Sequence, residues 1–334
     1  MTETDNRKDS IIILRAIAII LVIIGHTLTR YRADFSMSLS VRPFVDIIIS
    51  LIYAVHIPLF FTISGYLNHS QPYRNYLWKK VLRILVPFVV FSLLKLIFSN
   101  FISAQYAHGD SLLSHLKQAF LYGELYWFCY AAFLIFAAAP LLWKKDGNGI
   151  APFGIAFAVI CALSVTFLPM FGISIPTVFQ FNNAVFYFPF FALGYCLRHS
   201  NFSLNFKRPA VTILLCIVSL SLIILFLFLS DINIDYETFF PVKFLAAISL
   251  MFLIFLCVRH LTPGRFISTV SAFSLQIMFF DSFFKIFLLS LFSKLGLTGV
   301  WICIPVVVTN LLLCILCCRI AEKFKITRKL TGLP

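Results

Sequence analysis

The stretch LRAIAIILVIIGHT, residues 14–27, decides the fold. Together with its apolar neighbours it is long enough to cross a hydrocarbon core of about 30 Å, which takes about 20 residues of helix. Yet it carries Arg15 near one end and His26 near the other. Charged side chains at membrane depth are costly and usually face a bundle interior or a water-filled cavity. The stretch therefore predicts a membrane helix with a polar site on one face.

The whole chain has the composition of a polytopic membrane protein. Of its 334 residues, 61% are hydrophobic and only 12% are charged, against roughly 25% in a soluble domain. Its apolar runs predict an all-α bundle of about ten transmembrane helices in a single membrane domain, 1–334, with a polar tail at 1–10 and a basic tail at 320–334. The predicted spans are 11–29, 45–67, 77–101, 125–143, 149–168, 183–198, 209–230, 239–258, 266–292 and 299–319.

The basic residues indicate the orientation of these spans. The formal net charge is +14, but Lys and Arg lie between the apolar runs rather than on one soluble face, so no nucleic acid partner is expected. If the N-terminus is cytoplasmic, most of the 27 Lys and Arg fall in cytoplasmic segments. This bias predicts that both termini are cytoplasmic.

The nine cysteines are expected to be small packing residues. Nearly all of them lie inside apolar runs, and the Cys-x-x-Cys spacing in CILCC, 314–318, has no further Cys or His pair nearby. Free cysteine is a common buried residue. No metal site is therefore expected.

Arg15 and His26 share one face of the first predicted helix. Eleven residues at about 100° each make three turns plus about 20°, and they rise by roughly 16 Å. Arg15 then lies near the cytoplasmic edge and His26 past the midplane, so that one hydrated cavity can reach both. Two alternatives stay open: Arg15 extends to the headgroups, and His26 forms a hydrogen bond between helices.

Five stretches together resemble a known family. Arginine, ten residues and histidine in LRAIAIILVIIGH are followed by HIPLFFTISGYL, 56–67, and these two patches are the specific ones. The others are KKVLRILVPF, 79–88, LYWFCYAAFLIFAAAPLL, 125–142, and SAFSLQIMFFDSFF, 271–284. Over almost its whole length the chain closely resembles the acyltransferase-three family of integral-membrane acyltransferases, especially the short members related to fucose O-acetylases and surface-polysaccharide O-acetyltransferases.

The chain departs from the family pattern at three positions. Ile12 stands where members often carry Asp, and Asp281 stands where a histidine is common. Lys80 replaces the first arginine of an Arg-x-x-Arg pair, which keeps the charge but loses the bidentate geometry of a guanidinium. These departures affect what the resemblance implies about the substrate rather than membership itself.

The resemblance implies an O-acyltransferase of the bacterial cytoplasmic (inner) membrane. Its donor would be a cytoplasmic acyl-CoA, commonly acetyl-CoA, with no metal, and its acceptor a carbohydrate hydroxyl in an exopolysaccharide, a lipopolysaccharide or a lipid-linked glycan. Membrane lipids would surround it. The sequence leaves open the acceptor sugar, the acyl group, the oligomeric state and a covalent acyl-histidine intermediate.

The chemistry requires a base and a cationic mouth for the CoA phosphates. His26 is the predicted base, because an imidazole can exchange a proton near neutral pH. Arg15 is predicted to be a catalytic residue together with His26 and also to bind the phosphates, as are Lys79, Lys80 and Arg83. For Lys79 and Arg83 the alternative is an ordinary topology signal on the cytoplasmic side.

Five further residues are expected around the acceptor, each with an alternative interpretation. They are His56, Glu124, Tyr126, Trp127 and Asp281. His56 lines the site or forms a polar contact between helices, and Glu124 orients the base or lies exposed at the interface. The two aromatic residues wall the cavity or belong to the interfacial aromatic belt. Asp281 belongs to the site or neutralises Lys285, four residues further along the same helix.

A secondary transporter or flippase of a glycan-related substrate is the rival from another functional class. Ten helices with buried charges would suit a transporter, whose folds often show internal repeats and broken helices near the midplane. No repeat is visible here, and residues 14–27 contain no proline. The acyltransferase interpretation is therefore favoured.

Overall fold

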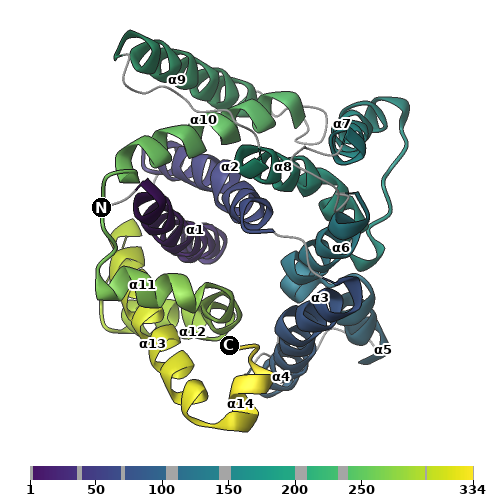
Figure 1. The fold of residues 1–334 in the computed structure, drawn as a ribbon. Coiled ribbons are helices and arrows are strands. Elements are labelled where there is room, and N and C mark those ends of the chain that lie inside the picture. The colour runs from purple at the N-terminus through teal and green to yellow at the C-terminus, as the bar shows by residue number, and fades with distance from the viewer. Residues whose placement is uncertain are drawn as a thin grey trace. The chain divides into compact units, whose positions relative to one another are not determined.

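The chain folds into helices throughout the parts that the structure describes (Figure 1). The computed structural model describes residues 3–35, 40–68, 72–102, 112–142, 152–199, 209–231, 240–297 and 299–333. Its helices are α1 (Glu3–Asp34), α2 (Arg42–Tyr66), α3 (Tyr73–Lys80), η1 (Val81–Leu85), α4 (Val86–Ile102), α5 (Leu112–Leu116), η3 (Lys117–Leu121), η4 (Glu124–Tyr126), α6 (Trp127–Leu142), α7 (Pro152–Phe167), η5 (Pro169–Phe171), η6 (Val178–Gln180), α8 (Phe181–His199), α9 (Pro209–Asp231), α10 (Phe240–Val258), α11 (Arg265–Ala272), α12 (Ser274–Lys294), η7 (Val300–Ile302), α13 (Cys303–Lys323) and α14 (Lys325–Leu330).

Within these parts, nine helical segments are long and apolar enough to cross a membrane. They are Arg7–Asp34, Arg42–Tyr66, Tyr73–Phe98, Glu124–Leu142, Phe153–Phe171, Ala210–Leu229, Phe240–Val258, Ser274–Lys294 and Val300–Lys323. The prediction of a polytopic all-α bundle is confirmed. The cytoplasmic placement of both termini stays a prediction, as does the single domain.

Two of the predicted spans are not among the nine segments as predicted. The predicted span 183–198 is the helix α8, which lies outside the nine and contains Asn182, Asn183, Pro189 and Arg198. The predicted span 266–292 is two helices, α11 and α12, that meet at Phe273. In α11 the hydroxyls of Ser268 and Thr269 donate to carbonyls four residues back, and such bonds compete with the helix ladder and bend helices.

The two predicted tails also contain helix. Residues 3–10, expected as a polar tail, form the first turns of α1. In the segment 320–334, expected as a basic tail, α13 continues to Lys323 and α14 follows at Lys325–Leu330. Short polar stretches become helical when they extend or adjoin a packed helix, because tertiary packing outweighs intrinsic propensity.

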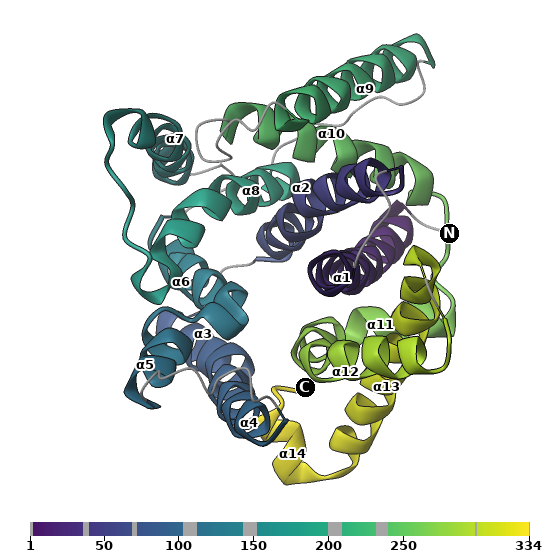
Figure 2. The ribbon, with the colours of Figure 1, turned by 180° about the vertical axis from the view of Figure 1, so that it is seen from behind.

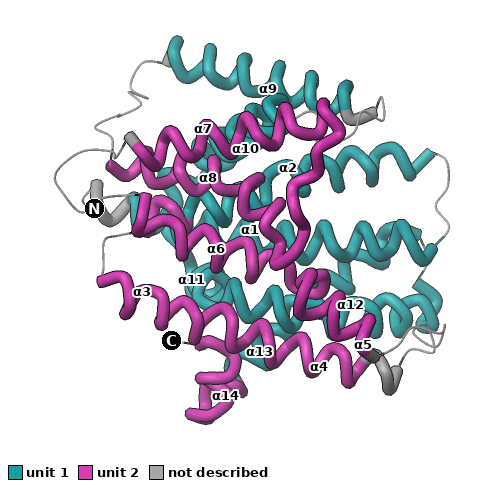
Figure 3. The backbone as a smooth tube through the Cα atoms, turned by 90° about the vertical axis from the view of Figure 1, so that its right-hand side faces the viewer, with its two compact units in different colours: residues 1–63, 201–319 teal, residues 64–200, 320–334 magenta. Residues whose placement is uncertain are grey.

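The described helices divide into two compact units (Figure 3). Unit 1 comprises residues 1–63 and 201–319, and unit 2 comprises residues 64–200 and 320–334. The division falls inside two helices, α2 and α13, whose residues belong partly to each unit.

Unit 1 is built around α1. This helix packs against α10, α11 and α12, and Figure 2 shows it lying between α2 and α11. Gly25 allows the close approach of α2, since a Cβ there would lie 2.9 Å from the Ile52 side chain. Leu28, Leu289 and Val306 are among the buried residues that join α1, α12 and α13 in one core.

Unit 2 is built around α6 and α8. Helix α8 packs against both α6 and α7, and α3 and η1 pack on α6. Phe188, Phe190 and Phe191 of α8 are fully buried. A Cβ on Gly65, at the end of α2, would lie 1.9 Å from the Phe191 carbonyl oxygen. The lack of a side chain on Gly65 therefore lets α2 and α8 approach closely.

Candidate active site

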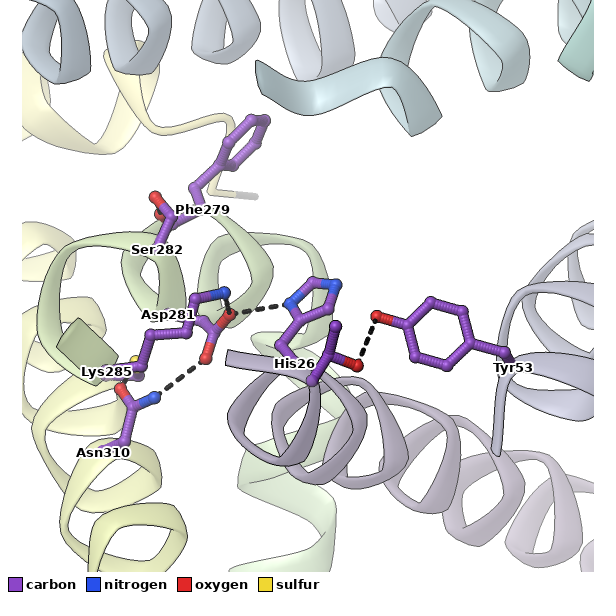
Figure 4. A network of polar contacts seen from close by, with 9 residues as sticks. His26, Tyr53, Phe279, Asp281, Ser282, Lys285 and Asn310 are labelled. Carbon is purple, nitrogen blue, oxygen red and sulfur yellow. Dashed lines mark hydrogen bonds and ion pairs between the residues drawn. The ribbon is translucent and has the colours of Figure 1, made fainter. Parts of the chain in front are cut away.

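The centre of the candidate site is a contact between His26 on α1 and Asp281 on α12 (Figure 4). Nδ1 of His26 lies 2.9 Å from Oδ2 of Asp281. The Asp281 residue is 0% exposed, whereas the His26 side chain is 34% exposed. One side of the imidazole is thus fixed inside unit 1 and the other side remains accessible.

Two more donors hold the Asp281 carboxylate. Nζ of Lys285, one turn further along α12, lies 3.2 Å from Oδ2. Nδ2 of Asn310 on α13 donates to Oδ1 at 2.8 Å. A buried carboxylate is costly unless it is paired and hydrogen-bonded. Donors from α1, α12 and α13 meet that requirement together.

This geometry determines which nitrogen of His26 carries the proton. An ionised carboxylate only accepts hydrogen bonds, so His26 Nδ1–H donates to Asp281. In the neutral imidazole the other nitrogen, Nε2, then has a free lone pair. Figure 4 shows this second nitrogen turned away from Asp281. Nε2 is therefore the atom able to accept a proton from a bound substrate.

Sequence reasoning found the members of this cluster unevenly. Asp281 was expected at the acceptor or in a pair with Lys285; the Lys285 pair is present, together with the contact to His26. Asn310 was missed, although an asparagine inside the apolar run 299–319 was a usable signal, because polar residues in spans tend to have a role. Its amide oxygen accepts from Cys314 Sγ at 3.4 Å.

Arg15 lies on the same unbroken helix as His26, eleven residues before it. Helix geometry therefore puts both on one face. Arg15 is partly exposed, but Ala18, Ile19 and Val22 between the two are almost fully buried. The helix face between them is packed against protein in the described structure, and a continuous hydrated passage stays a prediction.

His56 is buried on α2 in unit 1. Its Nδ1 donates to the Ile52 carbonyl oxygen at 2.6 Å within the same helix, and its ring meets that of Tyr53 edge-on. The Tyr53 hydroxyl in turn accepts from Thr29 of α1 at 3.3 Å. The imidazole orientation is set by its own helix, and its role at the acceptor stays a prediction.

The predicted donor cations Lys79, Lys80 and Arg83 lie in unit 2, at the junction of α3 and η1. Lys79 and Arg83 are exposed. Nζ of Lys80 lies 3.6 Å from the centre of the Phe136 ring and 5.3 Å from that of Tyr76, which is a cation–π arrangement. The three cations gather on adjacent turns, with Lys80 held against aromatic rings. A joint mouth with Arg15 of unit 1 stays a prediction.

The remaining predicted residues cluster at the start of α6 in unit 2. Glu124 is exposed and Tyr126 is buried under the ammonium of Lys95, which lies 5.3 Å from the ring centre. Trp127 stacks on Tyr187 of α8, with ring centres 5.5 Å apart. The role of Glu124 beside His26 stays a prediction, while Asp281 supplies the observed carboxylate contact.

Within the described ranges, His, Cys, Asp and Glu side chains form no group of three that could hold a metal ion. A base whose proton position is set by a buried carboxylate suits proton transfer from a hydroxyl.

The fold defines a multi-pass membrane protein, and the sequence identifies its family. The profile of the acyltransferase domain of the acyltransferase 3 family matches residues 8–319. The chain therefore belongs to the acyltransferase 3 family and is a membrane acyltransferase. Neither the curated proteins nor the solved structures contain a match to it. The matched range includes the whole His26 cluster and ends before α14.

Proposed function

We propose that this membrane acyltransferase moves an acetyl group from cytoplasmic acetyl-CoA to a hydroxyl of a surface or lipid-linked carbohydrate at the bacterial inner membrane. The observation that carries the proposal is the His26 imidazole, which is anchored through Nδ1 to buried Asp281 and leaves Nε2 open. Family membership supports acyl transfer. The acetyl group, the CoA carrier and the carbohydrate rest on the sequence resemblance.

The reaction then follows as a direct transfer. The acceptor oxygen attacks the thioester carbonyl carbon while Nε2 of His26 takes the hydroxyl proton. The tetrahedral intermediate collapses as the carbon–sulfur bond breaks, and the proton passes from the imidazolium to the departing CoA sulfur. Asp281 stabilises the imidazolium between these two steps and keeps the ring oriented. We assign Asp281 to this role rather than to acceptor binding, because its carboxylate is buried and already has three donors.

The donor phosphates are assigned to the basic residues. A guanidinium forms paired hydrogen bonds with a phosphate, and an ammonium acts as a point charge. The exposure of Lys79 and Arg83 supports direct contact. Lys80 adds charge from a position fixed on Phe136, and Arg15 is assigned to the same donor.

The acceptor is assigned to the residues near the start of α6 and to His56. A flat aromatic face such as the stacked pair of Trp127 and Tyr187 offers apolar contact to a sugar ring. The Glu124 carboxylate can accept hydrogen bonds from sugar hydroxyls. Tyr126, which is buried beside these residues, is assigned a packing role in this region.

The test is transfer of labelled acetyl from acetyl-CoA to glycan in membranes that contain the His26→Ala variant. We expect normal insertion and loss of transfer by about 10²- to 10⁴-fold, the usual contribution of a positioned general base. The matched control is His199→Ala, because His199 is exposed and its described contacts, a hydrogen bond to the Tyr195 carbonyl and stacking on the Tyr195 ring, stay within its own helix. Full transfer by His26→Ala would reject the base. Running the assay without an ion gradient also separates an acyltransferase from a transporter.

A further inference from the structure

The segment that follows α13 turns back on itself in unit 2. The backbone is extended at Phe324, which lies between the end of α13 at Lys323 and the start of α14 at Lys325. The hydroxyl of Thr327 contacts the carbonyl oxygens of Ala321 and Phe324, at 2.6 and 3.0 Å. A side-chain bond that spans the corner fixes the angle between two helices. The direction of α14 is therefore set by the chain itself.

The residues after α14 form a tight and buried cap. The N–H of Gly332 donates to the Lys329 carbonyl at 3.3 Å, and the N–H of Leu333 donates to the Arg328 carbonyl at 3.0 Å. With Gly332 at φ +69°, this is the Schellman pattern of helix ends. Thr331 and Leu333 are only 8% and 7% exposed. We call residues 324–333 the C-terminal clasp, because they are packed onto unit 2.

The clasp contacts the turn that carries Arg83. Helix α14 packs against α4. A Cβ on Gly332 would lie 2.7 Å from the Arg83 carbonyl oxygen and 2.7 Å from Cγ of Pro87. Distances below 3 Å leave no room for any side chain, so only glycine fits this approach.

The sequence of that turn explains why it needs support. Pro87 has no N–H, so the Arg83 carbonyl lacks the donor that an α-helix would provide four residues later. The helix widens here into the π-helical turn η1, closed by the bond from Val86 N–H to the Val81 carbonyl. Short π-helical turns are uncommon and are often found at functional sites. Gly332 lies against the Arg83 carbonyl, to which Pro87 cannot donate.

We propose that the C-terminal clasp positions Arg83 for the acyl donor by holding η1 in its wide form. This inference rests on the proposed function, in which Arg83 binds the donor phosphates. A π-helical turn holds more residues than an α-helical turn, so its loss would rotate Arg83 about the helix axis relative to Lys79 and Lys80. The clasp lies beyond the residues shared with the family, which end at 319. Gly332 is thus a positioning residue that acts through the backbone of Arg83.

The test compares Gly332→Ala with Gly172→Ala in the full-length protein. Both glycines have positive φ, +69° and +70°, but a Cβ on Gly172 would meet no atom within 4 Å. The backbone strain is therefore matched, and only Gly332→Ala collides with Arg83 and Pro87. We expect Gly332→Ala to raise the KM for acetyl-CoA roughly tenfold, the loss of about one charged hydrogen bond, with kcat unchanged. Gly172→Ala should leave both constants unchanged.

Point variants are preferred to truncation, because α14 carries Lys325, Arg328 and Lys329, whose removal would also change the local charge. If Gly332→Ala does not accumulate, Gly332→Asn replaces it. Asparagine tolerates positive φ, so this variant reduces the backbone strain and keeps the collision with Arg83 and Pro87. The clasp proposal is overturned if a Gly332 variant that is inserted normally has an unchanged KM for acetyl-CoA. It is also overturned if Gly172→Ala changes kcat and KM as much as the Gly332 variant does.

Binding of a non-transferable acetyl-CoA analogue distinguishes this failure from that of the proposed function. Arg83→Ala should weaken binding of the analogue, and the Gly332 variants should weaken its binding by a similar factor. If Arg83→Ala binds the analogue normally, the donor assignment is wrong and the inference falls with it. If Arg83→Ala weakens binding and the Gly332 variants do not, the donor assignment stands and the clasp is rejected.

Discussion

The two units place their chemically active residues in opposite ways. In unit 1 the Asp281 carboxylate is buried and satisfied by His26, Lys285 and Asn310 from three helices. In unit 2, Lys79 and Arg83 are exposed on a helix whose regular pattern is broken. Buried polar groups become rigid when fully paired, whereas exposed cations are screened by salt and adjust to a ligand. Under the proposed function, this difference suits unit 1 to proton transfer and unit 2 to binding an anion.

The largest expected effect comes from breaking the buried centre. Asp281→Asn replaces an acceptor by an amide that can donate to His26 Nδ1, and thereby favours the tautomer with its proton on Nε2. We expect kcat for acetyl transfer to fall by about 10²- to 10⁴-fold, as when a base is held in the wrong tautomer. The measurement is the transfer rate with both substrates saturating.

The matched control for this variant is Asp46→Asn. Asp46 belongs to unit 1 as well, but it is exposed and pairs with Arg32 at 2.7 Å. Exposed ion pairs contribute little, so transfer should be retained. A normal kcat in Asp281→Asn would mean that His26 does not depend on the carboxylate.

A smaller effect is expected at the third donor of the same centre. Asn310→Leu keeps the volume but leaves Oδ1 of Asp281 without its 2.8 Å partner. A buried acceptor without a partner costs about 1–3 kcal/mol. We expect the variant to lose roughly that much stability to thermal unfolding in detergent and to lose about tenfold in kcat, with the donor KM unchanged. A rise in KM without loss of kcat would contradict the assignment of Asn310 to the proton-transfer centre.

The smallest expected effect sharpens the contrast between the units. Raising the salt concentration from about 0.05 to about 0.5 M shortens the screening length to a few ångströms and should weaken donor binding at Lys79 and Arg83 by roughly twofold to fivefold. The buried centre of unit 1 is shielded from mobile ions, so kcat should hold. Initial rates over a range of acetyl-CoA concentrations measure both constants. If high salt lowers kcat and leaves the KM for acetyl-CoA unchanged, the assignment of donor binding to unit 2 and of proton transfer to unit 1 is wrong.

The sequence predicted the fold well where hydropathy decides it. Apolar length identified the nine observed segments, because a bilayer of fixed thickness demands helices of fixed length. It failed at Phe273, where one predicted span is two helices and side-chain bonds to the backbone bend α11. The burial of Thr331 and Leu333 was equally invisible, since a basic segment by itself suggests a solvated tail.

The candidate site was predictable only in its local parts. Arg15 and His26 lie on one helix, and Asp281 and Lys285 are four residues apart, so helical spacing alone relates each pair. The contact between His26 and Asp281 joins residues 255 positions apart, which a single sequence does not reveal. Asn310 looked like an isolated polar residue for the same reason. The donor cations were visible as a cluster, but the π-helical turn that arranges them depends on Pro87 and on Gly332.

The pairing of Asp281 with Lys285 also bears on how the protein is made. A lone charge inside a span costs about 2.5–3.5 kcal/mol when a helix enters the bilayer. Asp281 carries its own counter-ion one turn away at 3.2 Å, so the two charges inside α12 enter the lipid as a neutral pair, and Lys294 lies at the helix end. His26 has been synthesised long before that moment and Asn310 follows after it. Helix α12 therefore needs neither partner for insertion, and the contact between His26 and Asp281 can form afterwards, when the inserted helices associate.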